Sequence, residues 1–302
     1  MCKLCLGTVQ FGMNYGINNQ LGRQPGLYEV FEILDYALSN GIDTIDTASA
    51  YGDAELILGK YFKMYPEKSN VKLISKLLPN CIKNNDVKGT IEKEITDTLK
   101  KLNVNFLDGY LLHTPEYVLN EEIVNAMVVM KDKGLVKNIG VSVYDIEHGF
   151  DAINTNKVDY IQLPYSIFDK RGKKTGFLKK AKEAGITVFT RSAFLQGLFM
   201  MDENKIPGWL IESKPYLKVL NNLLDKYKIN KIDALFGFVK READIDYLVF
   251  GVETIEQIKE DINRFNKINV PESFYIEAES YFDNLKESII IPSLWSNNKR
   301  TR

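Results

Sequence analysis

The chain of 302 residues is 45% hydrophobic and 26% charged, and its formal net charge is -1 at pH 7. This composition is ordinary for a globular protein, and the balanced charge disfavours nucleic acid or an anionic membrane as a partner. The sequence shows no signal peptide and no apolar run of about 18 residues, so we expect a protein that is neither secreted nor membrane-spanning. The three cysteines, Cys2, Cys5 and Cys81, cannot all pair and lack further metal ligands, which predicts reduced thiols in the cytoplasm and no metal site.

Short apolar runs typical of buried parallel strands alternate with amphipathic helical patterns along the chain. The predicted strands are 3–8, 42–46, 71–76, 107–113, 136–142, 159–163, 186–190 and 246–250. The predicted helices between them are 28–39, 53–63, 88–102, 120–133, 145–154, 173–184 and 215–241. Eight such units in about 250 residues predict an α/β fold, a (β/α)8 TIM barrel with its active site at the C-terminal ends of the strands. A doubly wound open sheet is the alternative, but the glycine spacing after the first strand does not match its fingerprint.

The remaining segments are expected to complete a single domain spanning 1–302. The longest irregular segment, 191–213, follows the seventh strand, and loops of this length are usually functional, so it could cover a ligand. Two further helices are predicted near 254–264 and 271–286. We expect the C-terminal helix and tail, about 265–302, to pack on the barrel, with a frayed basic end at 297–300.

Four chemically distinct side chains lie at three successive predicted strand ends. Asp46 ends the second strand and Tyr51 follows it, Lys76 ends the third strand, and His113 ends the fourth. Because the strand ends of a barrel face one mouth, we expect these side chains to converge. Lys76 is expected to favour the tyrosinate and to lower the pKa of Tyr51, while Asp46 neutralises the lysine. His113 can donate a hydrogen bond to a substrate oxygen. Such a site protonates an alkoxide as it forms, and the hydride has to come from a bound cofactor.

These residues resemble the aldo-keto reductase family, and the resemblance covers nearly the whole chain. The segment Gly41 to Gly52 is similar to the first signature of the family, Lys76 matches its catalytic lysine, and Leu111 to His113 matches its histidine. The resemblance implies a catalytic tetrad of Asp46, Tyr51, Lys76 and His113, with Tyr51 as the general acid. It also implies the reduction of an aldehyde or ketone with a nicotinamide cofactor.

The resemblance further implies a set of cofactor contacts. In the family, the residues at Ser142 and Gln162 hold the nicotinamide carboxamide, and the segment Gly251 to Ile258 holds the adenosine end. The complete set of expected cofactor-binding residues is Gly7, Thr8, Ser142, Gln162, Arg191, Ser192, Gly197, Gly251, Glu253, Thr254 and Gln257.

Several positions depart from the family pattern. Val143 stands where the family usually has asparagine, and Arg191 stands where an aromatic ring often stacks on the nicotinamide. A guanidinium plane can stack as well, or it can bind an anionic substrate. The positions that commonly bind a 2′-phosphate read Gly251, Glu253 and Gln257, and a glutamate there would repel phosphate and could accept a hydrogen bond from a ribose hydroxyl. Family habit narrowly favours NADP(H), and NAD(H) remains the alternative.

Two classes of function fit this sequence. The first is an enzyme that reduces a small carbonyl substrate, or runs the reverse oxidation. The second is a cofactor-binding redox-sensing or regulatory module, resembling potassium-channel β subunits. The chain begins directly at its first strand, which favours the enzyme. The segment 6–17 resembles a bacterial subgroup often associated with surface-polysaccharide or sugar-nucleotide pathways, which implies a sugar-like carbonyl substrate. We expect a monomer or small homo-oligomer.

Overall fold

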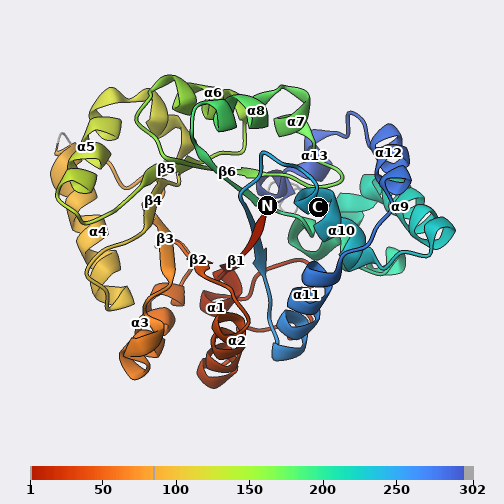
Figure 1. Cartoon of the computed structure of the whole chain (residues 1–302), viewed down its shortest axis with the longest axis horizontal. Helices are drawn as coiled ribbons and strands as arrows, with labels where there is room; N and C mark the ends of the chain where they lie inside the picture. The colour runs from red at the N-terminus through yellow and green to blue at the C-terminus, as the bar shows by residue number, and fades with distance from the viewer. Residues whose placement is uncertain (1, 84–85, 296–302) are drawn as a thin grey trace.

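Eight parallel strands close into a barrel in chain order in the computed structural model, which describes residues 2–83 and 86–295 (Figure 1). The strands are β1 (Lys3–Gly7), β2 (Thr44–Asp46), β3 (Lys72–Lys76), β4 (Gly109–Leu112), β5 (Ile139–Ser142), β6 (Tyr160–Pro164), β7 (Thr187–Arg191) and β8 (Tyr247–Gly251). Each strand pairs with the next, and β1 pairs with β8 to close the barrel, with Gly7 opposite Gly251. The prediction of a (β/α)8 barrel is confirmed, with all eight strands found where the sequence indicates them.

The helices surround the strands, as Figure 1 shows. They are α1 (Val9–Gly12), α2 (Leu27–Ser39), α3 (Ala54–Met64), α4 (Val87–Leu102), α5 (Glu121–Asp132), α6 (Ile146–Asn154), α7 (Arg171–Lys174), α8 (Phe177–Glu183), α9 (Lys214–Tyr227), α10 (Lys231–Lys240), α11 (Ile255–Lys267), α12 (Glu272–Tyr281) and α13 (Glu287–Ile290). Six short 3-10 turns are also present in the described ranges: η1 (Pro66–Lys68), η2 (Pro115–Leu119), η3 (Leu195–Met200), η4 (Glu203–Lys205), η5 (Gly208–Ser213) and η6 (Pro292–Leu294).

Local sequence explains the helix boundaries. In α4, Ile91 and Ile95 are fully buried on one face, while the Asp86 carboxylate accepts a hydrogen bond from the Gly89 N–H at 2.9 Å and caps the N-terminus. The helix ends at Asn103, which adopts a left-handed conformation with φ 56°. Apolar spacing thus sets the buried face, and the capping residues set the ends.

Three predicted helices are interrupted. The predicted helix 173–184 is wrong as one element, because Gly176 adopts φ 73° between α7 and α8. The predicted helix 215–241 divides at Lys228, with φ 55°, and restarts where the Asn230 side chain accepts a hydrogen bond from the Ile232 N–H at 2.8 Å. The predicted helix 271–286 ends at Tyr281. Apolar spacing continues across these breaks because the segments on both sides pack against the same core.

The barrel interior holds a small apolar cluster of its own. Cys5, Ile74, Leu111 and Phe189 pack together there, separate from the larger core between strands and helices. Because inward-pointing side chains pack together in a closed barrel, the polar side chains at the C-terminal strand ends lie above an apolar base.

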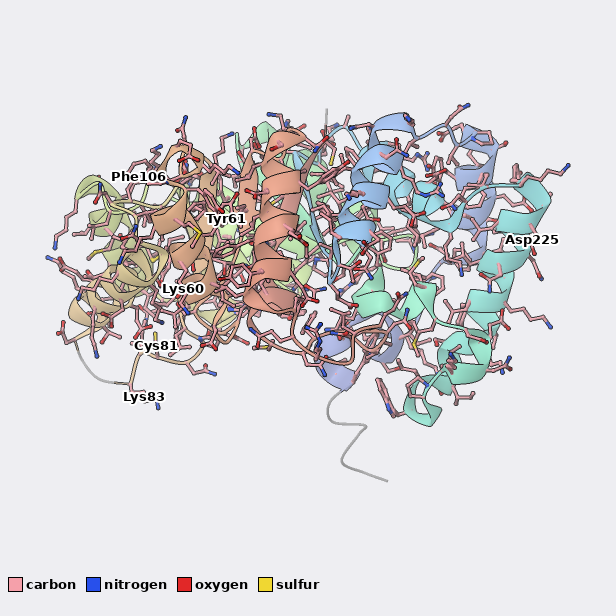
Figure 2. The ribbon with its side chains drawn as sticks, turned by 90° about the horizontal axis from the view of Figure 1, so that it is seen from below. Lys60, Tyr61, Cys81, Lys83, Phe106 and Asp225 are labelled. Atoms are coloured by element: carbon pink, nitrogen blue, oxygen red, sulfur yellow. The ribbon has the colours of Figure 1, made fainter. Side chains whose placement is uncertain are left out.

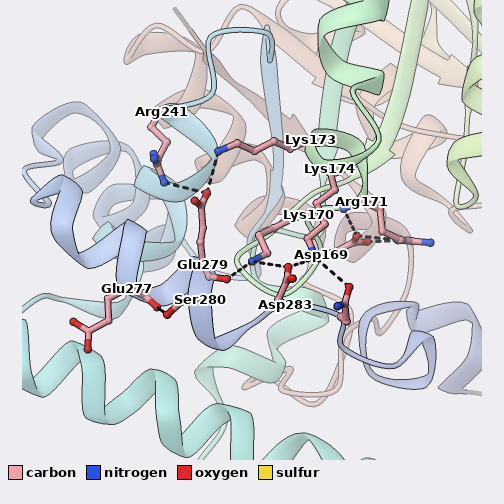
Figure 3. Close-up of polar contacts among 11 residues, drawn as sticks. Asp169, Lys170, Arg171, Lys173, Lys174, Arg241, Glu277, Glu279, Ser280 and Asp283 are labelled. Atoms are coloured by element: carbon pink, nitrogen blue, oxygen red, sulfur yellow. Dashed lines mark hydrogen bonds and ion pairs between the residues drawn. The ribbon is translucent and has the colours of Figure 1, made fainter.

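Ion pairs fasten α12 to the segment around α7 (Figure 3). The buried Lys170 donates to the Glu279 carbonyl oxygen at 2.7 Å and lies 3.7 Å from the Asp283 carboxylate. Lys173 and Arg241 both reach the Glu279 carboxylate, at 3.0 and 3.3 Å. These contacts join α12 to the segment around α7, and the packing of the whole segment 265–302 on the barrel stays a prediction. The predicted frayed end at 297–300 lies outside the described residues.

All three cysteines are free thiols, and they differ in burial. Cys2 and Cys5 are buried, and burial raises the pKa of the Cys2 thiol to about 12. Cys81 lies in the loop after β3, near Lys83, and burial raises its pKa to about 11 (Figure 2). Thiols with raised pKa values are poor nucleophiles near neutral pH, because little thiolate is present. No helix in the described ranges is long and apolar enough to cross a membrane.

Candidate active site

A buried ion pair forms the base of the site. The Lys76 ammonium nitrogen lies 2.7 Å from both carboxylate oxygens of Asp46, and it also donates to the Thr47 carbonyl oxygen at 2.9 Å. The Lys76 side chain is 0% exposed and that of Asp46 is 3% exposed. An unpaired charge at this depth would be strongly unfavourable. The residue that ends β2 and the residue that ends β3 therefore depend on each other for charge compensation.

The turn between β2 and α3 delivers Tyr51 to this pair. Its hydroxyl oxygen lies 3.4 Å from the Lys76 ammonium, a long hydrogen bond, and the ammonium lies 4.9 Å from the centre of its ring. The turn passes so close to α1 that a Cβ on Gly12 would lie 1.7 Å from the Tyr51 carbonyl oxygen. Gly12 therefore sets how deeply the tyrosine sits in the mouth.

The pKa of Tyr51 differs from the prediction. Burial raises this pKa well above its ordinary value, and the Asp46 carboxylate raises it further, while the Arg191 guanidinium opposes both. The lowering of this pKa that the sequence predicted is therefore not the net effect in this structure, because burial and the Asp46 carboxylate set the direction. The phenol is consequently protonated near neutral pH, the state that a proton donor needs.

His113 completes the group from the end of β4. Its ring centre lies 5.9 Å from that of Tyr51, in an edge-to-face arrangement. Burial lowers the pKa of His113 to about 3, with further lowering by the charges of Lys76 and Arg191. The imidazole is therefore neutral near pH 7 and can donate one N–H to a ligand oxygen. Its Nδ1 is buried and has no hydrogen-bond partner among the described residues.

Hydrogen bonds connect the two expected carboxamide-binding residues to the ion pair. The Gln162 side-chain amide donates to Asp46 at 2.8 Å, and the Ser142 hydroxyl donates to the Gln162 side-chain oxygen at 3.3 Å. Both side chains are nearly fully buried, at 1% and 2% exposed. A ligand bound at Ser142 or Gln162 would thus lie directly beside the tetrad.

A cavity of about 610 Å³ opens above these groups. Asp46, Tyr51 and His113 line one end, whereas Lys76 lies behind Asp46 and does not reach the wall. The structure places every expected cofactor-binding residue along this cavity: Gly7, Thr8, Ser142, Gln162, Arg191, Ser192, Gly197, Gly251, Glu253, Thr254 and Gln257. The lining also includes Glu253 and Thr254 at the N-terminus of α11, and the volume lies in the range of small-molecule sites.

Glu253 has a different environment from the one predicted. Its carboxylate is largely buried and accepts a hydrogen bond from the Gln20 backbone N–H at 2.9 Å. Its own backbone N–H donates to the Gln257 side-chain oxygen at 2.7 Å, and Thr254 caps α11. The carboxylate thus holds the loop after β1, which competes with the predicted hydrogen bond to a ribose hydroxyl.

The loops after β1 and β7 meet over the cavity. The Gln196 side-chain amide donates to the Tyr15 hydroxyl at 2.7 Å. The Gln196 backbone carbonyl oxygen accepts from the Ile17 backbone N–H at 3.0 Å. Gln196 adopts φ 54°, an unfavourable conformation for a residue other than glycine. We call this contact between Tyr15, Ile17 and Gln196 the clasp. It accounts for part of the long irregular segment, 191–213, that the sequence suggested as a cover.

Several polar cavity residues were not predicted from the sequence, among them Gln10, Tyr15, Tyr144 and Asp261. Asp261 lies on the buried face of α11, where the spacing alone predicts an apolar residue. The segment 6–17, which contains Tyr15, carries a resemblance to a bacterial subgroup but no pattern that assigns Tyr15 to the cavity. Tyr144 follows the departure at Val143, which was a signal that this loop differs from the family.

The cavity fits a nicotinamide dinucleotide. The Gln10 side-chain oxygen is buried without a partner among the described residues and lies where a Cβ on Gly251 would come within 2.4 Å. The Gln10 side chain fills the space beside Gly251, and its orphaned acceptor leaves an unmet hydrogen bond for a ligand hydroxyl. Ser142 and Gln162 would hold the carboxamide end, and the backbone at the start of α11 would hold the adenosine end.

Comparisons with known proteins agree with this geometry. The model of the Aldo/keto reductase family matches residues 3–280. The closed parallel barrel together with this family match identifies the chain as an oxidoreductase with a (β/α)8 fold. The chain belongs to the aldo/keto reductase family, so the resemblance found in the sequence is confirmed.

The similarity to individual relatives covers between 55% and 95% of this chain. The NADH-specific methylglyoxal reductase of Escherichia coli (strain K12) is 24% identical over 299 residues, covering 88% of this chain and 90% of that protein. The aldo-keto reductase YhdN of Bacillus subtilis (strain 168) is 32% identical over 175 residues, covering 55% and 52%. The holo form of the aldo-keto reductase AKR11C1 from Bacillus halodurans shares the fold, with a TM-score of 0.76 at 20% identity and coverage of 95% and 94%.

Proposed function

We propose that the protein reduces a small aldehyde or ketone to an alcohol, with Tyr51 as the general acid. The observation that carries this proposal is a partly buried phenol and a partly buried imidazole that line one cavity beside a buried lysine-carboxylate pair. Burial raises the pKa of Tyr51 and lowers that of His113, which favours the neutral form of both groups near pH 7. The names of relatives as methylglyoxal reductases support carbonyl reduction as the reaction class. A sugar-like carbonyl compound remains the proposed substrate type, from the resemblance of segment 6–17.

The proposed mechanism follows from the charges in the site. The substrate carbonyl oxygen accepts hydrogen bonds from the Tyr51 hydroxyl and from His113, which orients the carbonyl and withdraws charge from its carbon. A bound nicotinamide cofactor supplies the hydride that this carbon receives. The oxygen then takes the phenolic proton from Tyr51, giving the neutral alcohol. The Lys76 ammonium, 3.4 Å from that hydroxyl, stabilises the tyrosinate until solvent returns the proton.

The charges along the cavity favour NAD(H) as the proposed cofactor. Glu253, Glu256, Glu260 and Asp261 line the end at α11, and no Lys or Arg from the described residues lines that end. Negative side chains would repel a 2′-phosphate, so we propose NAD(H) in place of the narrow NADP(H) preference drawn from family habit. The NADH specificity in the name of the Escherichia coli relative supports this choice.

The test of the reaction is turnover of NADH with methylglyoxal and with small aldoses. We expect Tyr51→Phe to lower kcat by at least about 10²–10⁴. The dissociation constant for NADH, measured by quenching of protein fluorescence, should stay nearly unchanged. Unchanged turnover in the variant would remove Tyr51 from the proton-donor role. Tight NADH binding without turnover of any carbonyl compound would instead favour the regulatory class of function.

A further inference from the structure

The Arg191 side chain is held in a fixed orientation at the mouth of the cavity. Arg191 is the last residue of β7, and its guanidinium carbon lies 4.0 Å from the centre of the Tyr144 ring. One guanidinium nitrogen donates to the Val143 carbonyl oxygen at 3.1 Å. Stacking on a ring and one hydrogen bond to the backbone fix the plane of the group. The remaining N–H groups are left for other partners.

Arg191 differs from the other arginines of the described chain in having no acidic partner. The carboxylates of Glu29, Asp169, Glu279 and Glu260 pair with the other four arginines at 2.7 to 3.3 Å: Arg23, Arg171, Arg241 and Arg264. No carboxylate in the described ranges lies within 4.0 Å of the Arg191 guanidinium. Partly buried cations are normally paired, so the missing partner of Arg191 points to an anion that arrives from outside.

The position of this cation relates it to the reacting groups. Among the described residues that line the cavity, Arg191 is the only Lys or Arg. Its charge lowers the pKa values of Tyr51 and His113, the two groups that face a substrate carbonyl. It also lowers the pKa of Tyr15, against the raising effect of burial. An anion bound at Arg191 would therefore share the cavity with the carbonyl that Tyr51 protonates.

We propose that Arg191 binds an anionic group of the substrate, a carboxylate or a phosphate, so that the preferred substrates are carbonyl compounds carrying a negative charge. This inference rests on the proposed carbonyl reduction. The N–H groups of a planar guanidinium match the paired oxygens of either anion. Tyr144 and Val143 act as positioning residues, because they set the plane in which the guanidinium meets the anion. Stacking of Arg191 on the nicotinamide, the other role suggested by the sequence, predicts different results.

The experiment compares neutral and anionic substrates of similar shape. The pairs are D-glyceraldehyde with D-glyceraldehyde 3-phosphate, and butanal with succinic semialdehyde, which separate phosphate from carboxylate as the anion. We expect the unmodified protein to have a higher kcat/KM for at least one anionic member. Arg191→Met should lower kcat/KM for that member by about 10- to 100-fold, mainly through KM, because a charge-assisted contact of this kind is lost. Arg191→Lys should recover part of this loss.

Controls separate anion binding from other roles. Arg191→Met also removes a charge that acts on Tyr51 and His113, so the readout is the ratio of kcat/KM between the anionic and the neutral member of each pair, which should fall by about 10- to 100-fold. The dissociation constant for NADH is measured for both proteins, so that a loss of cofactor binding can be told apart from a loss of anion binding. Lys179→Met, which removes a cation that is 79% exposed on α8, should change neither substrate class. Equal losses for neutral and anionic substrates, or a weakened affinity for NADH, would assign Arg191 to the cofactor or to structure and overturn the proposal.

A binding measurement keeps the inference separate from the proposed reaction. Calorimetric titration of the NADH-loaded protein with succinate and with glycerol 3-phosphate reads the anion site without turnover. We expect at least one of them to bind the unmodified protein and to bind Arg191→Met at least about tenfold more weakly. If no carbonyl compound is turned over but this difference is found, the proposed reaction fails and the anion site stands. Absence of any Arg191-dependent binding, together with no anionic preference in turnover, overturns the anion site.

Discussion

The Lys76 ammonium nitrogen lies 2.7 Å from each oxygen of the Asp46 carboxylate, and both side chains are shut off from water. Because the pair is enclosed, each charge depends on the other for compensation, and the tyrosine hydroxyl above it meets a lysine whose charge is already balanced. The same contact therefore governs both the stability of the barrel mouth and the acidity of Tyr51.

The first prediction concerns the stability of this pair. Asp46→Asn and Lys76→Met should each lower the free energy of unfolding by about 3–5 kcal/mol, because each leaves one buried charge uncompensated. The double variant should lose less than the sum of the two. Urea unfolding followed by circular dichroism measures these differences. Additive losses would show that the two side chains do not act as a pair.

The second prediction ranks the catalytic variants. Lys76→Met should lower kcat more than His113→Gln, because the lysine stabilises the tyrosinate while the histidine orients the carbonyl. The comparison is made at saturating cofactor, with folding checked by circular dichroism. If His113→Gln were the less active of the two, histidine would become the better candidate for the proton donor.

A third prediction uses the pKa of His113, which burial lowers to about 3. A group with a lowered pKa stays neutral above that value, so the histidine should not titrate between pH 5 and 8, the range in which an ordinary histidine changes charge. The plot of kcat against pH should therefore have no inflection near pH 6.5 that depends on His113. The unmodified protein and His113→Gln should have the same profile in this range. A histidine-dependent inflection there would show that the imidazole is charged during turnover.

The fourth prediction concerns Asp261, a carboxyl on α11 that is 7% exposed. Burial, with help from Glu260 and against Arg264, raises its pKa from 3.8 to about 7. A raised carboxyl pKa means that the folded state binds the proton more tightly, so stability is lost as the pH rises from about 4 to 7. Asp261→Asn should accordingly stabilise the protein by about 1–4 kcal/mol at pH 8 and by little at pH 4. Urea unfolding at the two pH values measures the change, and an equal effect at both would contradict the assigned pKa.

The fifth prediction concerns cofactor choice. Gln257→Arg introduces a cation in the first turn of α11, where the family commonly binds a 2′-phosphate, and should raise the affinity for NADPH relative to NADH by about 10- to 100-fold. Glu253→Arg should instead weaken both cofactors, because it removes the hydrogen bond that holds the Gln20 backbone. Fluorescence quenching gives the six dissociation constants, those of the unmodified protein and of each variant for both cofactors. A preference for NADPH in the unmodified protein beyond about a hundredfold would mean that an unidentified cation reaches the phosphate.

The strands and the placement of the tetrad were predictable because both follow from local patterns. Short apolar runs predict buried strands, and the ends of parallel strands meet at one mouth, so Asp46, Lys76 and His113 converge as expected. The raised pKa of Tyr51 was not predictable, since it depends on burial and on Asp46 at a distance that no spacing reveals. The same holds for the stacking of Arg191 on Tyr144, two side chains from different strand ends.

Helix interruptions were missed for a related reason. The break at Lys228 leaves the apolar spacing intact on both sides, because α9 and α10 cover the same core. Only the capping residue Asn230 marks the restart, and a single asparagine is a weak signal inside a long helical pattern. The orientation of Glu253 was likewise set by Gln20, a residue from the opposite end of the chain.

That contact between Gln20 and Glu253 bridges the seam where β1 meets β8, and Gly7 and Gly251 face each other across the same seam. The end of the cavity at α11, the proposed adenosine site, is thus made from the first and last strands of the barrel, whereas the proposed tetrad comes from its first half. During synthesis, the catalytic side chains would leave the ribosome long before any dinucleotide could find its binding site. A nascent chain lacking β8 should therefore carry the whole tetrad and still fail to retain NADH.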